Sequence, residues 1–142
     1  RMMAGSEPWI TLKRDYDASV QTLTSPGKEV YVAADGSQIL GFIILNMQGG
    51  FTGYIQSIGV APEWRSRGIG RRLVAYAEER IFREAPNVFI CVSSFNSGAQ
   101  RFYRSLGYEA IGELKDFVVR GHSEILLRKT IAPWREFKKR PV

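Results

Sequence analysis

The chain has 142 residues, of which 44% are apolar, 12% aromatic and 24% charged, and its formal net charge is +6. This length suits one compact domain over residues 1–142, and the apolar content excludes a disordered chain. The single cysteine, Cys91, excludes an intramolecular disulfide framework and favours a reducing compartment, so we expect a cytoplasmic protein. The longest apolar run, Ile39 to Leu45, is too short to cross a bilayer, so we expect no membrane contact.

Positive charge is concentrated in two segments of the chain. Residues 64–84 hold six basic and three acidic residues, and residues 128–142 hold six basic and one acidic residue. The tail carries no nucleic-acid-binding motif, so we interpret residues 130–142 as a solvated basic end and expect no nucleic-acid partner. Binding of nucleic acid through net charge remains an alternative, which salt-dependent oligonucleotide binding would identify.

The first half of the chain predicts a short helical segment followed by an antiparallel meander. The helical segment lies between Trp9 and Leu23, within a short N-terminal segment, residues 1–28. Turn signals at Asp35-Gly36 and Gly49-Gly50 then separate β-rich runs. The predicted strands are residues 29–34, 38–47 and 53–60.

The second half alternates helices with strands. After Gly68 apolar residues recur every four positions from Ile69 to Ile81, which predicts an amphipathic helix that Pro86 stops. Residues 87–93 form a nearly continuous apolar run, typical of a strand buried on both faces. A second helix is capped by Asn96 or Ser97, and two further strands, 108–117 and 123–129, form a hairpin. The order predicts a mixed α/β sheet with helices packed against it.

Glycines and arginines gather where the third strand gives way to the first long helix. The start of a helix carries unpaired backbone N–H groups and the positive end of the helix dipole. Glycines at 68 and 70 let an anion approach those amides, so the segment predicts a diphosphate site, although glycines kept for tight packing would look the same. The arginines that could add charge-assisted contacts are Arg65, Arg67 and Arg71. A P-loop is excluded because the Gly-Lys-Ser/Thr ending is absent, and a dinucleotide fingerprint because Leu73 replaces its third glycine.

Two sequence blocks resemble the GCN5-related N-acetyltransferase (GNAT) family. The segment Arg65-Ser66-Arg67-Gly68-Ile69-Gly70 matches the family's acyl-CoA signature, Gln/Arg-x-x-Gly-x-Gly/Ala. The second block is matched on the next helix by Asn96, Ala99, Phe102-Tyr103 and Gly107-Tyr108. The resemblance covers residues 29–129. It implies a mostly antiparallel sheet with a V-shaped splay between its two central strands and helices on both faces.

The resemblance also implies site residues and acetyl-CoA as cosubstrate, without a metal. Ile58 and Val60 match the strand whose backbone pairs with the pantetheine arm, and Asn96 matches a second contact to that arm. The diphosphate would be held by the amides of residues 67–71, namely Arg67, Gly68, Ile69, Gly70 and Arg71, with Arg65 nearby. Tyr103 matches the general acid that protonates the departing thiolate, a role suited to a positioned hydroxyl. A buried core aromatic is the alternative interpretation of Tyr103.

The general base is not assigned by the sequence. Family members commonly place a carboxylate on the strand before the signature, but residues 48–62 contain no Asp or Glu. Gln56 and Ser57 are the polar groups there, and Glu63 follows in the loop that should face the phosphates. His122 and Glu124, on the last hairpin, could reach the acceptor.

We expect an N-acetyltransferase that moves an acetyl group directly to a primary amine through a ternary complex. A small-molecule amine and a protein amine both remain open as acceptors. The family usually has more chain before the meander, so the acceptor groove is expected to be open, or completed by the basic tail or by a second copy of the chain in a homodimer. The alternative is a non-catalytic acyl-CoA sensor or interaction module of the same fold.

Overall fold

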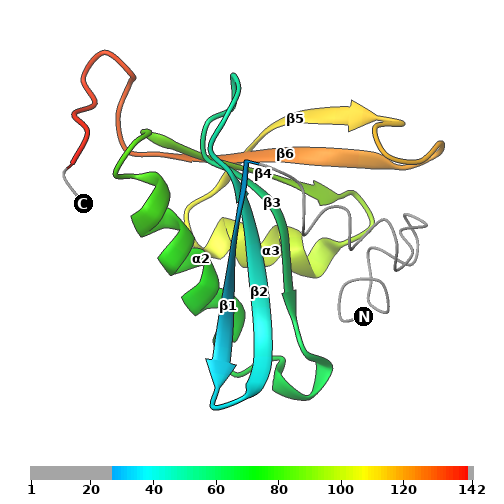
Figure 1. Ribbon diagram of the computed structural model, residues 1–142. Helices are drawn as coiled ribbons and strands as arrows, with labels where there is room; N and C mark the ends of the chain where they lie inside the picture. Colours follow the sequence, from blue (N-terminus) through cyan, green and yellow to red (C-terminus); the bar gives the residue numbers. More distant parts are fainter. Residues whose placement is uncertain (1–26, 141–142) are drawn as a thin grey trace.

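The computed structural model describes residues 27–140, which form six strands and two α-helices (Figure 1). The elements in chain order are β1 (Lys28–Asp35), β2 (Gln38–Asn46), β3 (Tyr54–Val60), a 3₁₀ turn η1 (Pro62–Trp64), α2 (Ile69–Ile81), β4 (Asn87–Ser93), α3 (Ser97–Ser105), β5 (Glu109–Lys115) and β6 (Ser123–Thr130). Every element predicted within residues 27–140 is present, and the ends differ by one or two residues except at α2, which ends at Ile81, several residues before Pro86. The helical segment predicted between Trp9 and Leu23 lies outside the described residues.

The six strands form one sheet in the order β1-β2-β3-β4-β6-β5. All neighbouring strands pair antiparallel except β3 and β4, which run parallel because α2 connects them as a crossover. The expected mixed, mostly antiparallel sheet is therefore confirmed. The β1–β2 turn lies at Gly36-Ser37, one residue later than predicted, with Gly36 at φ 61°.

Helices α2 and α3 pack on the same face of this sheet. The predicted stripe on α2 is buried, since Ile69, Leu73, Ala77 and Ile81 are all at most 8% exposed. These side chains share one core with residues of β2, β4 and α3. The helices expected on the opposite face would come from residues before 28, outside the described part of the chain. Within residues 27–140, no helix is long and apolar enough to cross a membrane.

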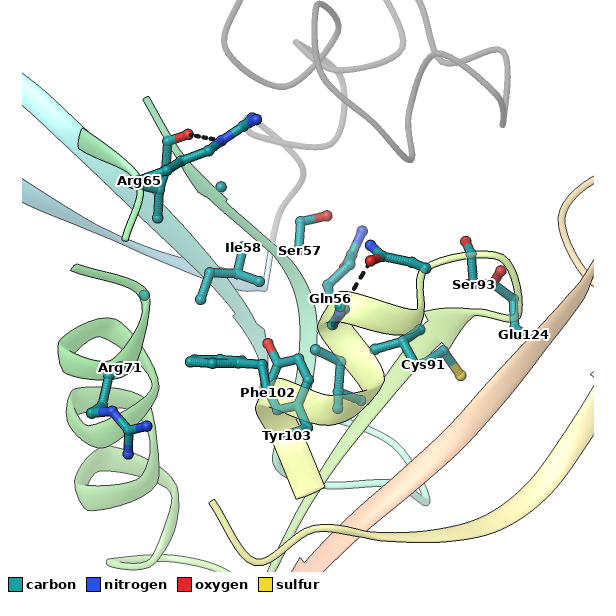
Figure 2. Close-up of a pocket in the computed structure, with 18 of the residues that line it drawn as sticks. Gln56, Ser57, Ile58, Arg65, Arg71, Cys91, Ser93, Phe102, Tyr103 and Glu124 are labelled. Carbon is teal, nitrogen blue, oxygen red and sulfur yellow. Dashed lines mark hydrogen bonds between the residues drawn. The ribbon is translucent and has the colours of Figure 1, made fainter. Parts of the chain in front are cut away.

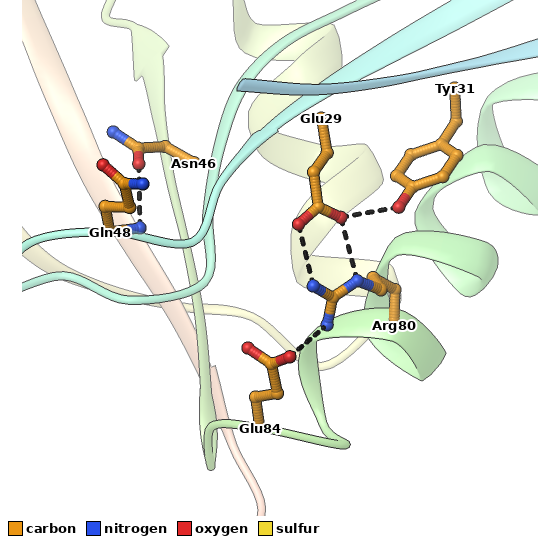
Figure 3. A network of polar contacts seen from close by, with 6 residues as sticks. All are labelled: Glu29, Tyr31, Asn46, Gln48, Arg80 and Glu84. Carbon is orange, nitrogen blue, oxygen red and sulfur yellow. Dashed lines mark hydrogen bonds and ion pairs between the residues drawn. The ribbon is translucent and has the colours of Figure 1, made fainter. Parts of the chain in front are cut away.

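A polar clamp joins the edge strand β1 to α2 (Figure 3). Arg80 donates two hydrogen bonds to the carboxylate of Glu29, at 2.8 and 2.7 Å, and the phenol of Tyr31 donates a third at 2.6 Å. Burial alone would raise the pKa of Glu29, but the hydrogen bonds from Arg80 and Tyr31 outweigh burial and lower it. Arg80 also contacts Glu84 at 3.2 Å, so the clamp fixes the end of α2 farthest from the glycine-rich segment.

Candidate active site

The central strands β3 and β4 separate soon after they meet. They pair only at Tyr54–Phe89 and Ile55–Ile90, and the rest of β3 runs away from β4 (Figure 1). A cavity of about 820 Å³ lies along this splay, lined by residues of both strands, the start of α2, α3 and the β5–β6 hairpin. The splay that the family resemblance implied is present.

The separation coincides with a bulge in β3. Ile44 and Leu45 of β2 pair with Ser57 and Ile55, which leaves Gln56 without a partner on β2. A bulge adds one residue to a strand, bends it and changes which side chains share a face. Consequently Ile58 packs toward the helix-covered core, as Ile55 does, although strict alternation would place them on opposite faces.

The start of α2 forms one end of the cavity. Gly68 is the N-cap residue of α2, at φ 81°. The first backbone hydrogen bond of this helix runs from Arg72 N to Gly68 O at 3.1 Å. The amides of residues 69–71 therefore lack intrahelical acceptors. A Cβ placed on Gly68 would meet nothing within 4 Å of the protein, so this space is open to a ligand. Arg65 and Arg71 line this end and make it positive.

Tyr103 lies in the middle of the cavity lining, on α3 (Figure 2). Its side chain is 2% exposed, and no group among residues 27–140 makes a hydrogen bond with its phenol oxygen. Burial, and secondarily the negative charge of Glu78, raise the pKa of Tyr103. Tyr103 therefore stays protonated well above neutral pH and can donate a hydrogen bond only to something that enters the cavity.

The other end of the cavity is formed by β4, β6 and the hairpin that precedes β6. Ser93 and Glu124 face each other across the β4–β6 pair and are 1% and 6% exposed. Cys91, two residues before Ser93 on the same strand face, also lines the cavity. Burial, and secondarily the charge of Glu124, raise the pKa of the Cys91 thiol, while a hydrogen bond with Tyr54 opposes the shift.

Most residues predicted for the site line this one cavity. They are Gln56, Ser57, Ile58, Val60, Arg65, Gly68, Gly70, Arg71, Asn96, Tyr103 and Glu124. The side chain of Asn96 also caps α3 by accepting a hydrogen bond from Ala99 N at 3.0 Å. Glu63 is exposed on η1, and it is not part of the cavity lining.

Three residues predicted for the site are not part of the cavity lining. The guanidinium of Arg67 stacks on the Trp64 ring at 4.9 Å and does not line the cavity. The side chain of Ile69 is buried in the core, so only its amide is available to a ligand. The ring of His122 packs edge to face on Phe95, with centroids 5.1 Å apart, outside the cavity lining.

Sequence reasoning missed several lining residues, namely Tyr54, Cys91, Ser93, Phe102, Phe117 and Val118. A polar Ser93 ending an otherwise apolar strand was a weak signal. Phe117 and Val118 lie in the β5–β6 hairpin and are 60% and 39% exposed, although apolar. Exposed apolar side chains at the mouth of a cavity are a signal for ligand contact that only the fold reveals.

Comparison with known proteins identifies the family. The model of the acetyltransferase (GNAT) family matches residues 3–108. The chain is a GNAT acetyltransferase. N-alpha-acetyltransferase RimI of Mycobacterium tuberculosis is 30% identical over 115 residues, which cover 79% of this chain and 68% of that protein. The expected enzyme class, an N-acetyltransferase, is confirmed.

Solved structures share this GNAT fold. An aminoglycoside 6'-N-acetyltransferase complexed with coenzyme A has a TM-score of 0.74 at 23% identity, over 93% of this chain and 88% of that one. An acetyltransferase of Bacillus anthracis in complex with acetyl coenzyme A has a TM-score of 0.70 at 23% identity, over 83% of this chain and 72% of that one. At these identities the likeness concerns the fold.

Proposed function

We propose that this GNAT acetyltransferase binds acetyl-CoA along the splay between β3 and β4 and transfers the acetyl group directly to a primary amine in a ternary complex. The observation that carries the proposal is a single cavity with an open, positive helix start at one end, a buried carboxylate at the other, and Tyr103 between them. An anionic cosubstrate and an amine can therefore enter from opposite ends.

The residues of the positive end fit the diphosphate of coenzyme A. Free amides at the start of α2 and the guanidinium groups of Arg65 and Arg71 supply several convergent donors. Each dipole or exposed-charge contribution is worth only about 0.3–1 kcal/mol, so several are needed together. Beyond Ile55 the edge of β3 that faces β4 has no strand partner within residues 27–140, and this edge is suited to hydrogen bonds with the amide groups of the pantetheine arm.

The bound thioester supplies an activated acetyl group and a thiolate leaving group. In this proposal, backbone N–H groups of β3 stabilise the oxyanion that forms when the amine attacks, an effect of about 3 kcal/mol per donor. Tyr103 donates its phenolic proton to the departing sulfur, because nothing else within residues 27–140 holds that proton in a hydrogen bond. Because the amine attacks the thioester directly, both substrates are bound together when the transfer takes place.

The decisive experiment is an amine panel scored by release of free thiol from acetyl-CoA. The panel contains small amines, peptides with free N-termini and lysine peptides, and we expect turnover with at least one class. Calorimetry with acetyl-CoA accompanies it, comparing the wild type with Gly68→Glu. The matched control is Gly49→Glu, because Gly49 has φ 84° and equally open surroundings but lies in the β2–β3 loop.

The outcomes separate the enzyme from its alternative. Loss of acetyl-CoA binding in Gly68→Glu, with Gly49→Glu unchanged, supports the helix start as the diphosphate site. Binding without turnover on any amine would instead favour an acyl-CoA sensor, an alternative kept open by the absence of Asp and Glu from residues 48–62. A wild type that binds no CoA thioester would contradict both.

A further inference from the structure

We propose that Glu124 binds the ammonium group of the acceptor and removes its proton, which makes Glu124 the general base of the transfer. This inference rests on the proposed function and supplies the base that the sequence left unassigned. It also defines the substrate class, an amine that arrives as a cation at the β4–β6 end of the cavity.

The charge distribution of the cavity supports this assignment. Glu124 is the only Asp or Glu among the described residues that line the cavity, and the arginines of the lining, Arg65 and Arg71, are near the start of α2. An anionic ligand is therefore favoured at one end and a cationic ligand at the other. Figure 2 shows Glu124 beside Ser93, across the cavity from Arg65 and Arg71.

The burial of Glu124 strengthens its attraction for a cationic ligand. Glu124 is only 6% exposed, so its negative charge is screened less than it would be in water and attracts a cation in the cavity more strongly. The Oγ of Ser93, directly opposite, is buried without a hydrogen-bond partner among residues 27–140. A primary ammonium has three N–H donors, so it can donate to Ser93 Oγ while it also contacts the Glu124 carboxylate.

The other candidate bases are less well placed. His122 stacks on Phe95 outside the lining, and Glu63 is exposed beside the segment that faces the phosphates. Cys91 lines the cavity, but burial raises the pKa of its thiol, which leaves little thiolate at neutral pH.

Among residues 27–140, the titratable groups that share the cavity with Glu124, apart from the arginines at its other end, come from three elements. Cys91 on β4, Tyr54 on β3 and Tyr103 on α3 share its cavity. On β5 the residue opposite Glu124 is Leu114, and the flanking Glu113 and Lys115 are exposed on the other strand face. On its own segment the nearest titratable group is His122.

The proton balance of the step is complete. The Glu124 carboxylate takes one proton from the ammonium, and the freed amine nitrogen forms a bond to the thioester carbonyl carbon. As the C–S bond breaks, Tyr103 gives its proton to the sulfur, and the second proton lost by the nitrogen restores the phenol. Glu124 releases its proton to solvent, so the amine cation and thioester yield the amide, the free thiol and one proton.

The test compares Glu124→Gln with a matched control, Glu113→Gln, which makes the same change at an exposed position of the neighbouring strand β5. The acceptor is the best amine of the panel, and kcat/KM is followed from pH 6 to above the pKa of that amine. Glu124→Gln should lose about 10²–10⁴-fold in kcat/KM near pH 7. Its rate should then rise about tenfold per pH unit as free amine accumulates, while the wild-type rate levels off.

A binding measurement supplies a readout that does not depend on turnover. Calorimetry of the same amine with the CoA-loaded protein should show affinity reduced about tenfold or more in Glu124→Gln, with CoA affinity unchanged. Glu124→Asp keeps the charge and should retain part of the rate, which keeps the proposal testable if the glutamine variant folds poorly.

Several results would overturn the proposal. Activity of Glu124→Gln within threefold of the wild type, or a loss of equal size at every pH, would exclude Glu124 as the base. If the wild type acetylates an amine and Glu124→Gln gives one of these two results, only the assignment of Glu124 as the base is contradicted, and the proposed function stands. A wild type that acetylates no amine removes the proposed function and this inference with it.

Discussion

The ring of Tyr108 meets the ring of Tyr103 edge to face, with the two centroids 5.2 Å apart. The Tyr108 hydroxyl donates a 2.8 Å hydrogen bond to Glu78 on α2, and Lys129 on β6 donates to the same carboxylate at 3.0 Å. Tyr103 thus packs on a neighbour that is hydrogen-bonded to Glu78 of α2, and Glu78 is in turn held by Lys129 of β6. The arrangement also places a negative charge near the phenol that we assign as the acid.

Replacing Tyr103 by Phe should reduce turnover about 10²-fold or more, because the departing thiolate loses its proton donor. Stability should be unchanged or slightly higher, since the lost hydroxyl is buried without a partner among residues 27–140. Steady-state kinetics, CoA calorimetry and thermal unfolding test both statements. Unchanged turnover would exclude Tyr103 as the acid.

The same chemical change at Tyr108 should have the opposite signature. Tyr108→Phe removes a hydrogen bond to the charged Glu78, which should lower the free energy of unfolding by about 1–3 kcal/mol. Turnover should stay within a few fold, because the Tyr108 hydroxyl faces Glu78 rather than a substrate. Chemical denaturation of both variants in parallel distinguishes the two tyrosines. A stability loss confined to Tyr103→Phe would contradict the assignment.

Glu78→Gln should lower the pKa of Tyr103, because the charge of Glu78 adds to burial in raising it. Burial remains in this variant, so the phenol should still be protonated at neutral pH. An ultraviolet difference titration of Glu78→Gln against the wild type, each with its Tyr103→Phe counterpart, isolates the one phenol. An onset of ionisation at equal or higher pH in Glu78→Gln would show that Glu78 has no such effect.

Cys91 should react slowly with iodoacetamide at neutral pH, because burial raises the pKa of its thiol and the thiolate is the reactive form. The rate should keep rising about tenfold per pH unit beyond the range where an ordinary thiol levels off. Acetyl-CoA should protect the thiol, which lines the cavity. Mass spectrometry of Cys91 follows both effects, and fast labelling that the cosubstrate leaves unchanged would contradict them.

Glu29→Gln should lower stability by about 1 kcal/mol, since the clamp to Arg80 is bidentate but partly exposed. The pKa of Glu29 is lowered in the folded state from its usual value of 4.5. The contribution should therefore be fully present above about pH 4.5 and be lost as the pH falls through the folded-state pKa. Urea unfolding of both proteins between pH 3 and 8 checks the sign, and a difference that grows toward acid would contradict it.

Local sequence signals predict the elements of this fold well. Gly68 and Asn96 mark the starts of α2 and α3, and the apolar period from Ile69 to Ile81 marks the buried stripe. These signals depend on near neighbours in the chain, which is why they can be seen without the fold.

The acceptor end of the site was harder to predict because it depends on contacts between distant segments. Ser93 and Glu124 are thirty-one residues apart and meet only because β6, rather than β5, pairs with β4. The same difficulty applies to His122, which the sequence places two residues from Glu124 but whose ring packs on Phe95. Nothing in the local sequence indicates that Glu124 lines the cavity and that His122 does not.

The unpartnered Gln56 has a consequence for how this enzyme can vary. Deleting that single residue would remove the bulge and restore regular alternation along β3, while Ser57 and Ile58 would keep their partners Ile44 and Ile43 on β2. Without the bend that the bulge introduces, we expect β3 to pair with β4 beyond Ile55 and to narrow the gap proposed for the coenzyme arm. We therefore expect a change in the length of this strand to be tolerated less well than a substitution in it.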